Sequence, residues 1–120
     1  MADKKIAGTC YLKVDGRNYT LAGKMNVSPS VVEREGKVGL SGVTGFKEMP
    51  RIPFVDCDLH TTADLSIAEL DAITSATVKV ELANGKNYVF TEAWTTAAHE
   101  VDGAEGTVSV RFESMDAQEI

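Results

Sequence analysis

The chain has 120 residues and a mass of 12.9 kDa, which fits one domain spanning residues 1–120. Hydrophobic residues make up 43% of the sequence and charged residues 25%, and because no apolar run approaches the roughly 18–20 residues of a membrane-spanning helix, we expect neither a membrane anchor nor an export signal. The whole net charge of −6 lies in residues 91–120, where Arg111 is the only base among seven acids, so tight binding to the phosphate backbone of DNA is disfavoured.

The first regular segment is a β-hairpin near the N-terminus, preceded by an arm of residues 1–7. Residues 9–14 alternate between apolar and polar side chains, as a strand with one buried face does. Asp15-Gly16 follows and suits a type I′ turn, because both central residues of that turn need a positive φ. Residues 17–21 then form the returning strand.

Two further strands, residues 31–35 and 52–59, flank a long connection. Pro53 lies near the start of the second strand, which suits a strand start or a sheet edge because proline lacks an amide donor. The connection covers residues 36–50 and is punctuated by glycines, so we expect a long interaction loop. Loops longer than about 12–15 residues in compact domains are usually functional.

The apolar residues of this connection are its candidate functional residues. Leu40, Val43 and Phe46 stand among glycines near its tip, and exposed apolar side chains on such a segment favour contact with a partner. The alternative is that they fold back onto the core of their own chain. The open sheet edges expected of a β-sandwich raise the same question, because an unpaired edge either needs protection or pairs with another chain. Both features indicate self-assembly.

One short helix is expected to begin at Ser66 and to end near residues 73–74. Ser66 and Glu69 have capping-box spacing, so each side chain can bond the other residue's backbone amide, and Leu65 can pack on Leu70. Its apolar stripe can cover the face of a sheet. We therefore expect the helix to have a packing role.

The C-terminal third contains a second hairpin and a last strand. Residues 77–82 alternate, Asn84-Gly85 turns the chain, and residues 87–94 return. Residues 107–113 alternate in the same way, and we expect this last strand to pair antiparallel with the segment 94–101.

Together these elements predict a mainly β (α+β) fold. It is an antiparallel β-sandwich or barrel of about six or seven strands, with one short α-helix as a lid and a long interaction loop. Residues 115–120 are expected to form a C-terminal tail.

The candidate catalytic and metal-ligating residues form no recognised pattern. His60 and His99 are the only imidazole bases, both are expected on the surface, and neither lies in a nucleophile motif. Cys10 and Cys57 are expected to be small buried residues without a disulfide. A zinc site built from these four residues lacks the usual ligand spacing. We therefore predict no catalytic residue, no metal and no cofactor.

Two other patterns carry equally little chemistry. Asp56 and Asp58 share a strand face, where an exposed polar face is favoured over a calcium site or paired catalytic carboxylates. Gly39, Gly42 and Gly45 are spaced by three, but no strand-turn-helix setting and no Lys-Ser/Thr pair accompany them, so a phosphate-binding loop is disfavoured.

Several motifs, in order along nearly the whole chain, carry a resemblance to a known family. They are Gly8-Thr9-Cys10-Tyr11-Leu12-Lys13-Val14-Asp15-Gly16, Glu33-Arg34-Glu35, Val38-Gly39-Leu40-Ser41-Gly42-Val43-Thr44-Gly45-Phe46-Lys47-Glu48, Pro50-Arg51-Ile52-Pro53-Phe54, Leu82-Ala83-Asn84-Gly85-Lys86-Asn87-Tyr88, Ala93-Trp94, Gly106-Thr107-Val108 and Phe112-Glu113. With them the chain resembles the tail tube proteins of Mu-like, contractile-tailed bacteriophages. Each motif is a structural signature, and the helix and the last residues match least.

The resemblance implies a structural virion protein that is a tail tube subunit. Subunits of that kind form hexameric rings that join edge to edge and stack into a tube, whose lumen conducts DNA during ejection without sequence-specific binding. It implies as partners other copies of the chain, the sheath protein, the tape-measure protein, and baseplate and terminator proteins. It places the protein in the virion tail, and in the host cytoplasm during assembly. By the same analogy Leu40, Val43 and Phe46 form an inter-ring contact.

Two other functions stay open at the level of sequence. One is the tube subunit of a headless contractile particle, whose tube can look the same. The other is a small β-sandwich module that binds a ligand or a polypeptide. An enzyme is disfavoured because the sequence offers no nucleophile with a base, no metal cluster and no cofactor motif.

Overall fold

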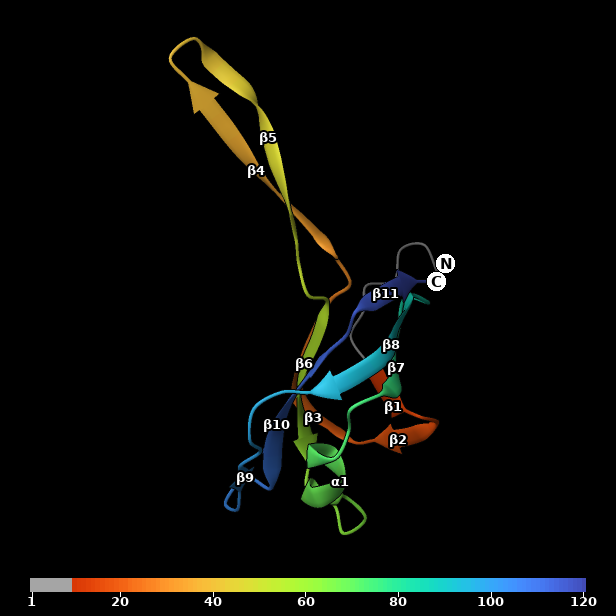
Figure 1. Ribbon diagram of the computed structural model, residues 1–120. Coiled ribbons are helices and arrows are strands. Elements are labelled where there is room, and N and C mark those ends of the chain that lie inside the picture. The colour runs from red at the N-terminus through yellow and green to blue at the C-terminus, as the bar shows by residue number, and fades with distance from the viewer. Residues whose placement is uncertain (1–9) are drawn as a thin grey trace.

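The computed structural model describes residues 10–120, which form eleven strands and one short helix (Figure 1). The elements are β1 (Cys10–Val14), β2 (Arg17–Tyr19), β3 (Leu21–Ser28), β4 (Val32–Gly39), β5 (Gly42–Pro50), β6 (Phe54–His60), α1 (Ile67–Asp71), β7 (Ala76–Leu82), β8 (Asn87–Thr95), β9 (Val101–Asp102), β10 (Thr107–Glu113) and β11 (Asp116–Glu119). All strand pairs are antiparallel. The predicted fold class, mainly β with one short helix, is confirmed.

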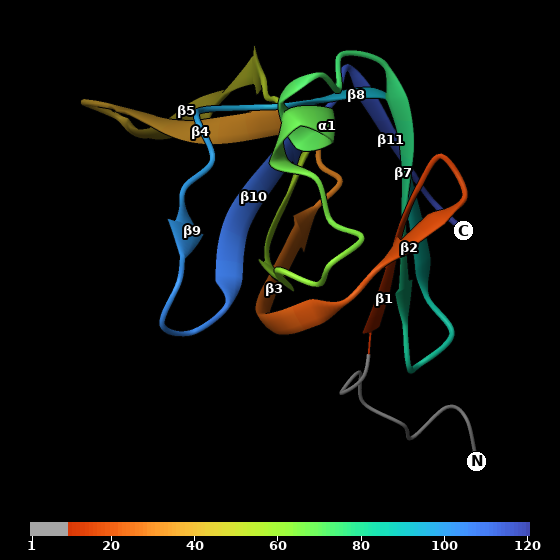
Figure 2. The ribbon, with the colours of Figure 1, turned by 90° about the horizontal axis from the view of Figure 1, so that it is seen from below.

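Nine strands belong to one hydrogen-bonded sheet that folds over on itself. Its order is β2-β1-β7-β8-β10-β6-β3, with β11 beside β8 and β9 beside β10. Figure 2 shows β1, β2 and β7 on one side of the body and β3 and β10 on the other, while β8 passes between the two sides and pairs with both β7 and β10. The two layers enclose the core, because strands with one apolar face must bury that face against another layer.

The core consists of the inward-facing residues of these two layers. In one layer Leu12 lies opposite Val80, and in the other Phe112 lies opposite Val55. The fully or nearly fully buried apolar residues are Leu12, Val14, Val55, Cys57, Leu59, Leu70, Ala76, Val78, Val80, Phe90, Ala93, Val108, Val110 and Phe112. The alternation read from the sequence thus places the right faces inward.

Ser114 forms the corner at which the chain leaves one layer for the other. It lies between β10 and β11, and its side chain is buried. The Ser114 hydroxyl contacts the carbonyl oxygens of Thr91 and Asp116 and accepts a hydrogen bond from the Asp116 amide at 3.2 Å. Its backbone amide donates to the Pro53 carbonyl at 3.2 Å. Because buried backbone groups need partners where a strand bends, this one hydroxyl satisfies groups that the sheet leaves free.

The helix begins as expected but its cap is only half of a capping box. The Ser66 hydroxyl accepts a hydrogen bond from the Glu69 amide at 3.4 Å. The Glu69 carboxylate, however, pairs with Arg17 on β2 instead of reaching back to Ser66. Leu70 is fully buried, and Leu65 packs against the core beside it. The packing role of the helix is therefore confirmed.

Both predicted hairpin turns are present, with different geometry. Asp15 and Gly16 both have positive φ, 51° and 81°, which agrees with the expected type I′ turn. The second turn is a three-residue loop closed by a hydrogen bond from Leu82 N to Lys86 O at 2.9 Å. In it only Gly85, at φ 90°, is left-handed.

Three strands were not expected from the sequence. β3 was missed because Gly23 stands where its alternation calls for an apolar side chain, at the point where the structure has an irregular register between Leu21 and Met25. β11 lies in the segment expected as a C-terminal tail, and its short polar sequence gains order by pairing with β8. The N-terminal arm of residues 1–7 lies outside the described residues.

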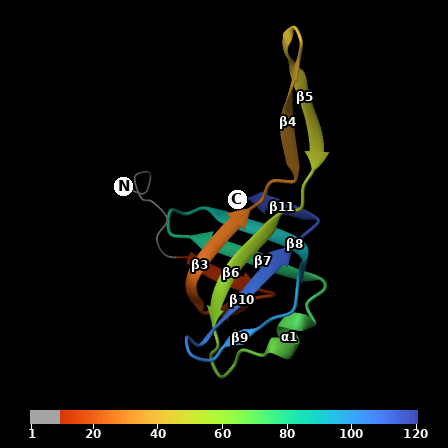
Figure 3. The ribbon, with the colours of Figure 1, turned by 90° about the vertical axis from the view of Figure 1, so that its left-hand side faces the viewer.

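The third unexpected strand, β5, changes the interpretation of residues 36–50. This segment was expected to be a long loop, but together with β4 it forms a regular two-stranded sheet. The β4–β5 hairpin projects from one end of the body, and α1 lies at the opposite end (Figures 1 and 3). The radius of gyration is accordingly 17.3 Å, against about 14 Å for a compact domain of this length.

Loss of the Ser114 hydroxyl should destabilise the body. We expect Ser114→Ala to lower the free energy of unfolding by about 1–3 kcal/mol, because buried backbone groups at the corner lose their partner. Urea denaturation of the monomer followed by circular dichroism measures this change. Ser109→Ala on the solvent-facing side of the preceding strand β10 is the control, and it should stay within about 0.5 kcal/mol of the native value. Equal effects of the two substitutions would contradict the role assigned to Ser114.

Cys57 offers a second test of the core. Burial, with the adjacent Asp56 and Asp58 carboxylates adding to it, raises the pKa of the Cys57 thiol to about 12. At about pH 8 only about one Cys57 in ten thousand would carry the reactive thiolate. We expect iodoacetamide to leave Cys57 unmodified in the native protein and to alkylate it fully in urea, as read by peptide mass spectrometry. Equal rates in the two states would show that Cys57 is not in the core.

Candidate assembly surface on the β4–β5 hairpin

The β4–β5 hairpin is a long ladder that lies outside the body. Its register runs from Val32 opposite Pro50 to Gly39 opposite Gly42, with an irregularity between Lys37 and Val38. Eight residues of a strand span about 27 Å. Apart from Met49, which is half-buried, every residue of the two strands is exposed.

The register divides the hairpin into two unlike faces. Val38 lies directly opposite Val43, and Phe46 lies opposite Gly36, so these side chains share one face because directly opposed residues point the same way. We call Val38, Val43 and Phe46, with Leu40 at the tip, the apolar face. Their exposed fractions are 78%, 83%, 63% and 112%. The three residues predicted as contact points therefore do not fold back onto their own core.

The opposite face carries charges. Glu33, Glu35, Lys37 and Lys47 alternate with the residues of the apolar face along the two strands. Lys37 Nζ lies 3.1 Å from Glu35 Oε1, and Glu35 is opposite Lys47 in the register. We call these four residues the charged face. Because acids and bases are balanced on it, this face is well suited to water.

Arg34 supports the apolar face from its base. Its Nε donates to Glu48 Oε1 at 3.0 Å across the ladder, and its guanidinium carbon lies 5.6 Å from the centre of the Phe46 ring. Both contacts lie on the surface and are individually weak. Arg34 thus contacts Phe46, which nevertheless remains 63% exposed.

The turn at the tip depends on glycine. Gly42 and Gly45 have φ values of 117° and 144°, a region that other residues rarely adopt. The Thr44 hydroxyl donates to the Lys37 carbonyl at 3.2 Å beside the irregularity. The spacing of three glycines thus reflects the turn and the bulge next to it, and phosphate binding is not needed to explain it.

Val38 belongs to the apolar face but was not singled out from the sequence. Its neighbours Lys37 and Gly39 gave no apolar pattern, and its position opposite Val43 depends on a register that only the paired strands reveal. Val38 could have been identified from the sequence if residues 36–50 had been recognised as a hairpin.

The structure does not bring the other sequence candidates together. Within residues 10–120 no group of three or more His, Cys, Asp or Glu side chains could hold a metal ion. Cys57 is in the core, and Cys10 is a free, half-buried thiol. His60 is exposed as expected. The expected surface position of His99 is wrong, because its side chain is only 1% exposed and its Nδ1 lies 2.5 Å from Asp71 Oδ1 on α1.

Asp56 and Asp58 lie on the solvent-facing side of β6 as expected. Asp56 pairs with Lys24 at 3.2 Å, and Asp58 accepts a hydrogen bond from the Ser109 hydroxyl at 2.7 Å. Each carboxylate thus has a partner of its own. Their separate partners favour a polar sheet surface over a shared ion.

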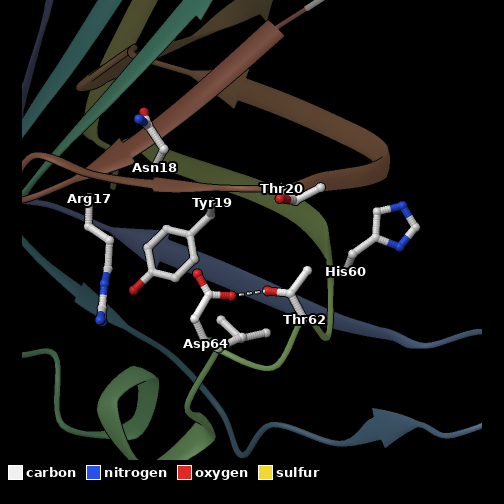
Figure 4. Close-up of a pocket in the computed structure, with 8 residues that line it drawn as sticks. Arg17, Asn18, Tyr19, Thr20, His60, Thr62 and Asp64 are labelled. Atoms are coloured by element: carbon white, nitrogen blue, oxygen red, sulfur yellow. Dashed lines mark hydrogen bonds between the residues drawn. The ribbon is translucent and has the colours of Figure 1, made fainter.

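One small polar cavity lies where β2 approaches the loop before α1 (Figure 4). Its volume is about 20 Å³, which is enough for about one water molecule. The Thr62 hydroxyl donates to Asp64 Oδ1 at 2.5 Å there, and this bond lowers the pKa of Asp64 below its usual value. The lining residues are Arg17, Asn18, Tyr19, Thr20, His60, Thr62, Asp64 and Leu65. The hairpin, and not this cavity, is therefore the candidate functional surface.

In the described part of the chain, no helix has the length and apolarity that a membrane crossing needs.

Comparisons with known proteins agree with this arrangement. The family model described as "Phage tail tube protein" matches residues 3–119. The Mu-like prophage FluMu tail tube protein of Haemophilus influenzae is 28% identical over 116 residues, which cover 97% of each chain.

Two solved structures are similar in fold. Hcp1 from Flavobacterium johnsoniae superposes with a TM-score of 0.62 at 14% identity, covering 92% of this chain and 93% of that one. The sheath/tube terminator of PVC, an extracellular contractile injection system, superposes with a TM-score of 0.65 at 8% identity, covering 92% of each chain. At such identities the likeness concerns the fold alone. The family match, in contrast, covers almost the whole sequence, and the chain belongs to the phage tail tube protein family, a structural family of tail components and not of enzymes.

Proposed function

We propose that this member of the tail tube family is the repeating subunit of the tail tube of a contractile-tailed phage. In this proposal the chain assembles into hexameric rings that stack into a tube, and DNA passes along the lumen during ejection. Sheath, tape-measure, baseplate and terminator proteins would be its further partners. It would act in the virion, after assembly in the host cytoplasm.

The observation that carries the proposal is the apolar face of the hairpin. Val38, Leu40, Val43 and Phe46 are each more than half exposed, on a ribbon that no other part of residues 10–120 covers. Covering one such side chain contributes about 1.5–3 kcal/mol. We propose that a subunit of the adjacent ring covers this face, so that Leu40, Val43 and Phe46, with Val38, form the contact between rings.

The charge of the hairpin is compatible with contact between copies. The whole chain carries −6, yet β4 and β5 together hold three acids and three bases, so the hairpin itself is neutral. Two strongly acidic molecules repel each other where their charges meet. Contact through a neutral ribbon avoids this repulsion.

The free edges of the body suit lateral pairing within a ring. Among the described strands, β3 is bonded only to β6, β11 only to β8, and β2 only to β1. A free edge offers unpaired amides and carbonyls to a neighbouring chain, and closure of a ring removes such edges. The net negative charge in turn would keep passing DNA from adhering to the protein.

A related assembly is the second candidate. The fold is also that of the sheath/tube terminator of an extracellular contractile injection system. A tube subunit of a contractile particle without a capsid would need the same hairpin contact. Capsid genes beside the gene for this chain would favour the phage.

Substitution on the apolar face tests the proposal. We expect Phe46→Asp to leave the monomer folded, because the ring is 63% exposed, and to suppress tubes seen by negative-stain electron microscopy. Loss of about 1.5–3 kcal/mol per contact would raise the concentration needed for assembly by roughly tenfold to a hundredfold.

Lys47→Gln is the matched control. It lies beside Phe46 on the charged face and changes the net charge by the same amount as Phe46→Asp. This variant should form tubes at the native concentration, with tail extract containing baseplates added to both samples as a nucleus. Tubes from Phe46→Asp, or equal loss in both variants, would overturn the assignment of the apolar face.

A further inference from the structure

The junction between hairpin and body is built from unusually restricted backbone. Two short connections, residues 29–31 and 51–53, run side by side there, joined by a hydrogen bond from Arg51 N to Val31 O at 2.9 Å. All three prolines of the chain, Pro29, Pro50 and Pro53, lie in or next to these connections. Each proline fixes its own φ and narrows the choices of the residue before it. A junction that allowed the hairpin to rotate freely would not be expected to contain these prolines.

The Arg51 side chain ties the two connections to the last residue of β3. Its Nη1 donates to Ser28 Oγ at 2.5 Å and to the Ser30 carbonyl oxygen at 3.3 Å. It thereby links the strand that leads out to the hairpin with the segment that leads back. Within residues 10–120 the ion pairs do not include Arg51. Its hydrogen-bond partners are neutral oxygens, which indicates a geometric role.

The same guanidinium also rests on the start of β6. The Arg51 guanidinium carbon lies 5.4 Å from the centre of the Phe54 ring, and that of Arg111 lies 3.9 Å from it. Arg111 is in turn held by Glu113, at 3.0 Å from its Nε. Next to Phe54, Pro53 is fully buried and accepts the hydrogen bond from the Ser114 amide. The base of the hairpin is thus connected to β3, β6 and β10 at one place.

A fixed junction matters because the direction of the hairpin at its base determines the position of its tip. Near the base a small rotation moves the tip by many ångströms, since the strands are about 27 Å long. Ordering a mobile segment on binding costs roughly 1–2 kcal/mol per residue fixed, and preorganisation removes that cost from the binding step. Arginine suits the task because its planar guanidinium can lie over a ring while its Nη1 donates to two oxygens, whereas the compact ammonium of lysine offers no flat face to stack.

We propose that Arg51 is a positioning residue that sets the direction of the β4–β5 hairpin in the free subunit, so that the apolar face is already oriented for a second copy of this chain. This inference rests on the proposed function for its consequence in assembly. The direction of the hairpin in the monomer can be measured without any assembly, so the two ideas fail separately.

The direct test is the distance distribution between two nitroxide labels on the dilute monomer. We place one label at the hairpin tip by Ser41→Cys and the other on the body by Glu105→Cys, both exposed positions. Cys10→Ser removes the half-buried thiol, and the buried Cys57 remains. The parent protein should give one narrow distribution and Arg51→Ala a broad one. Arg51→Lys should give a distribution of intermediate width, because it keeps the charge but loses the planar guanidinium.

Two further variants separate positioning from general stability. Ser28→Ala removes an acceptor of Arg51 without deleting a large side chain, and it should broaden the distribution in the same direction. Arg17→Ala removes an arginine near α1, at the other end of the body, and should leave the distribution narrow. Circular dichroism melts check that each variant is folded.

The assembly readout then tests the consequence. We expect Arg51→Ala to raise the concentration needed for tubes by about tenfold, with Arg51→Lys restoring part of the loss. A broad distribution in the parent, a narrow one in Arg51→Ala, or unchanged assembly despite broadening would each overturn the inference. A parent protein with a narrow distribution that never forms tubes would instead overturn the proposed function and leave Arg51 as the residue that orients the hairpin.

Discussion

The rest of the structure depends on the fact that a two-stranded ribbon has no interior. In the body the sheet folds over and its apolar faces meet each other, so residues such as Phe90 and Phe112 are removed from water within one chain. The hairpin satisfies its backbone through the ladder between β4 and β5 but has no second layer. An isolated hairpin of this kind is only marginally stable in water. Its apolar face therefore stays in contact with water in the single subunit, and this exposure is what the proposed contact with another copy would remove.

The two parts of the molecule are consequently stabilised in different ways. The body relies on a buried core and on a few buried polar groups such as Ser114 at the corner. The hairpin relies on cross-strand contacts such as that of Arg34 with Glu48, which lie in water and contribute little each. The junction around Arg51 and Phe54 belongs to both parts. Through it, the stiffness of the body can be transmitted to a segment that has no core of its own.

Local sequence patterns predicted the features that depend on neighbouring residues alone, namely turns, the start of the helix and the inward faces of strands. Asp15-Gly16 specified its turn, Ser66 specified the start of the helix, and period-two alternation placed Leu12 and Val110 inward. β3 was not predicted, because Gly23 leaves a gap in its apolar alternation and its pairing with β6 depends on residues distant in sequence. The partner of Glu69 was likewise set by Arg17, which is distant in sequence.

The hairpin shows the same division between local and non-local information. Its glycines suggested an irregular loop, since glycine is common in both loops and turns. Leu40, Val43 and Phe46 were correctly recognised as apolar residues in an unusual place, because hydrophobicity needs no partner to be read. Which side they share could not be read, because the face of a strand residue depends on register, and Val38 enters the set only with the pairing in view.

The glycines of the hairpin allow the backbone geometry of its apolar face. Gly36 lies opposite Phe46, and a Cβ added at Gly36 would meet no heavy atom within 4 Å. Gly42 and Gly45 allow the turn and the bulge that bring Val43 opposite Val38. The glycines that suggest an irregular loop in the sequence thus belong, once β4 and β5 pair, to a regular ribbon with one apolar face.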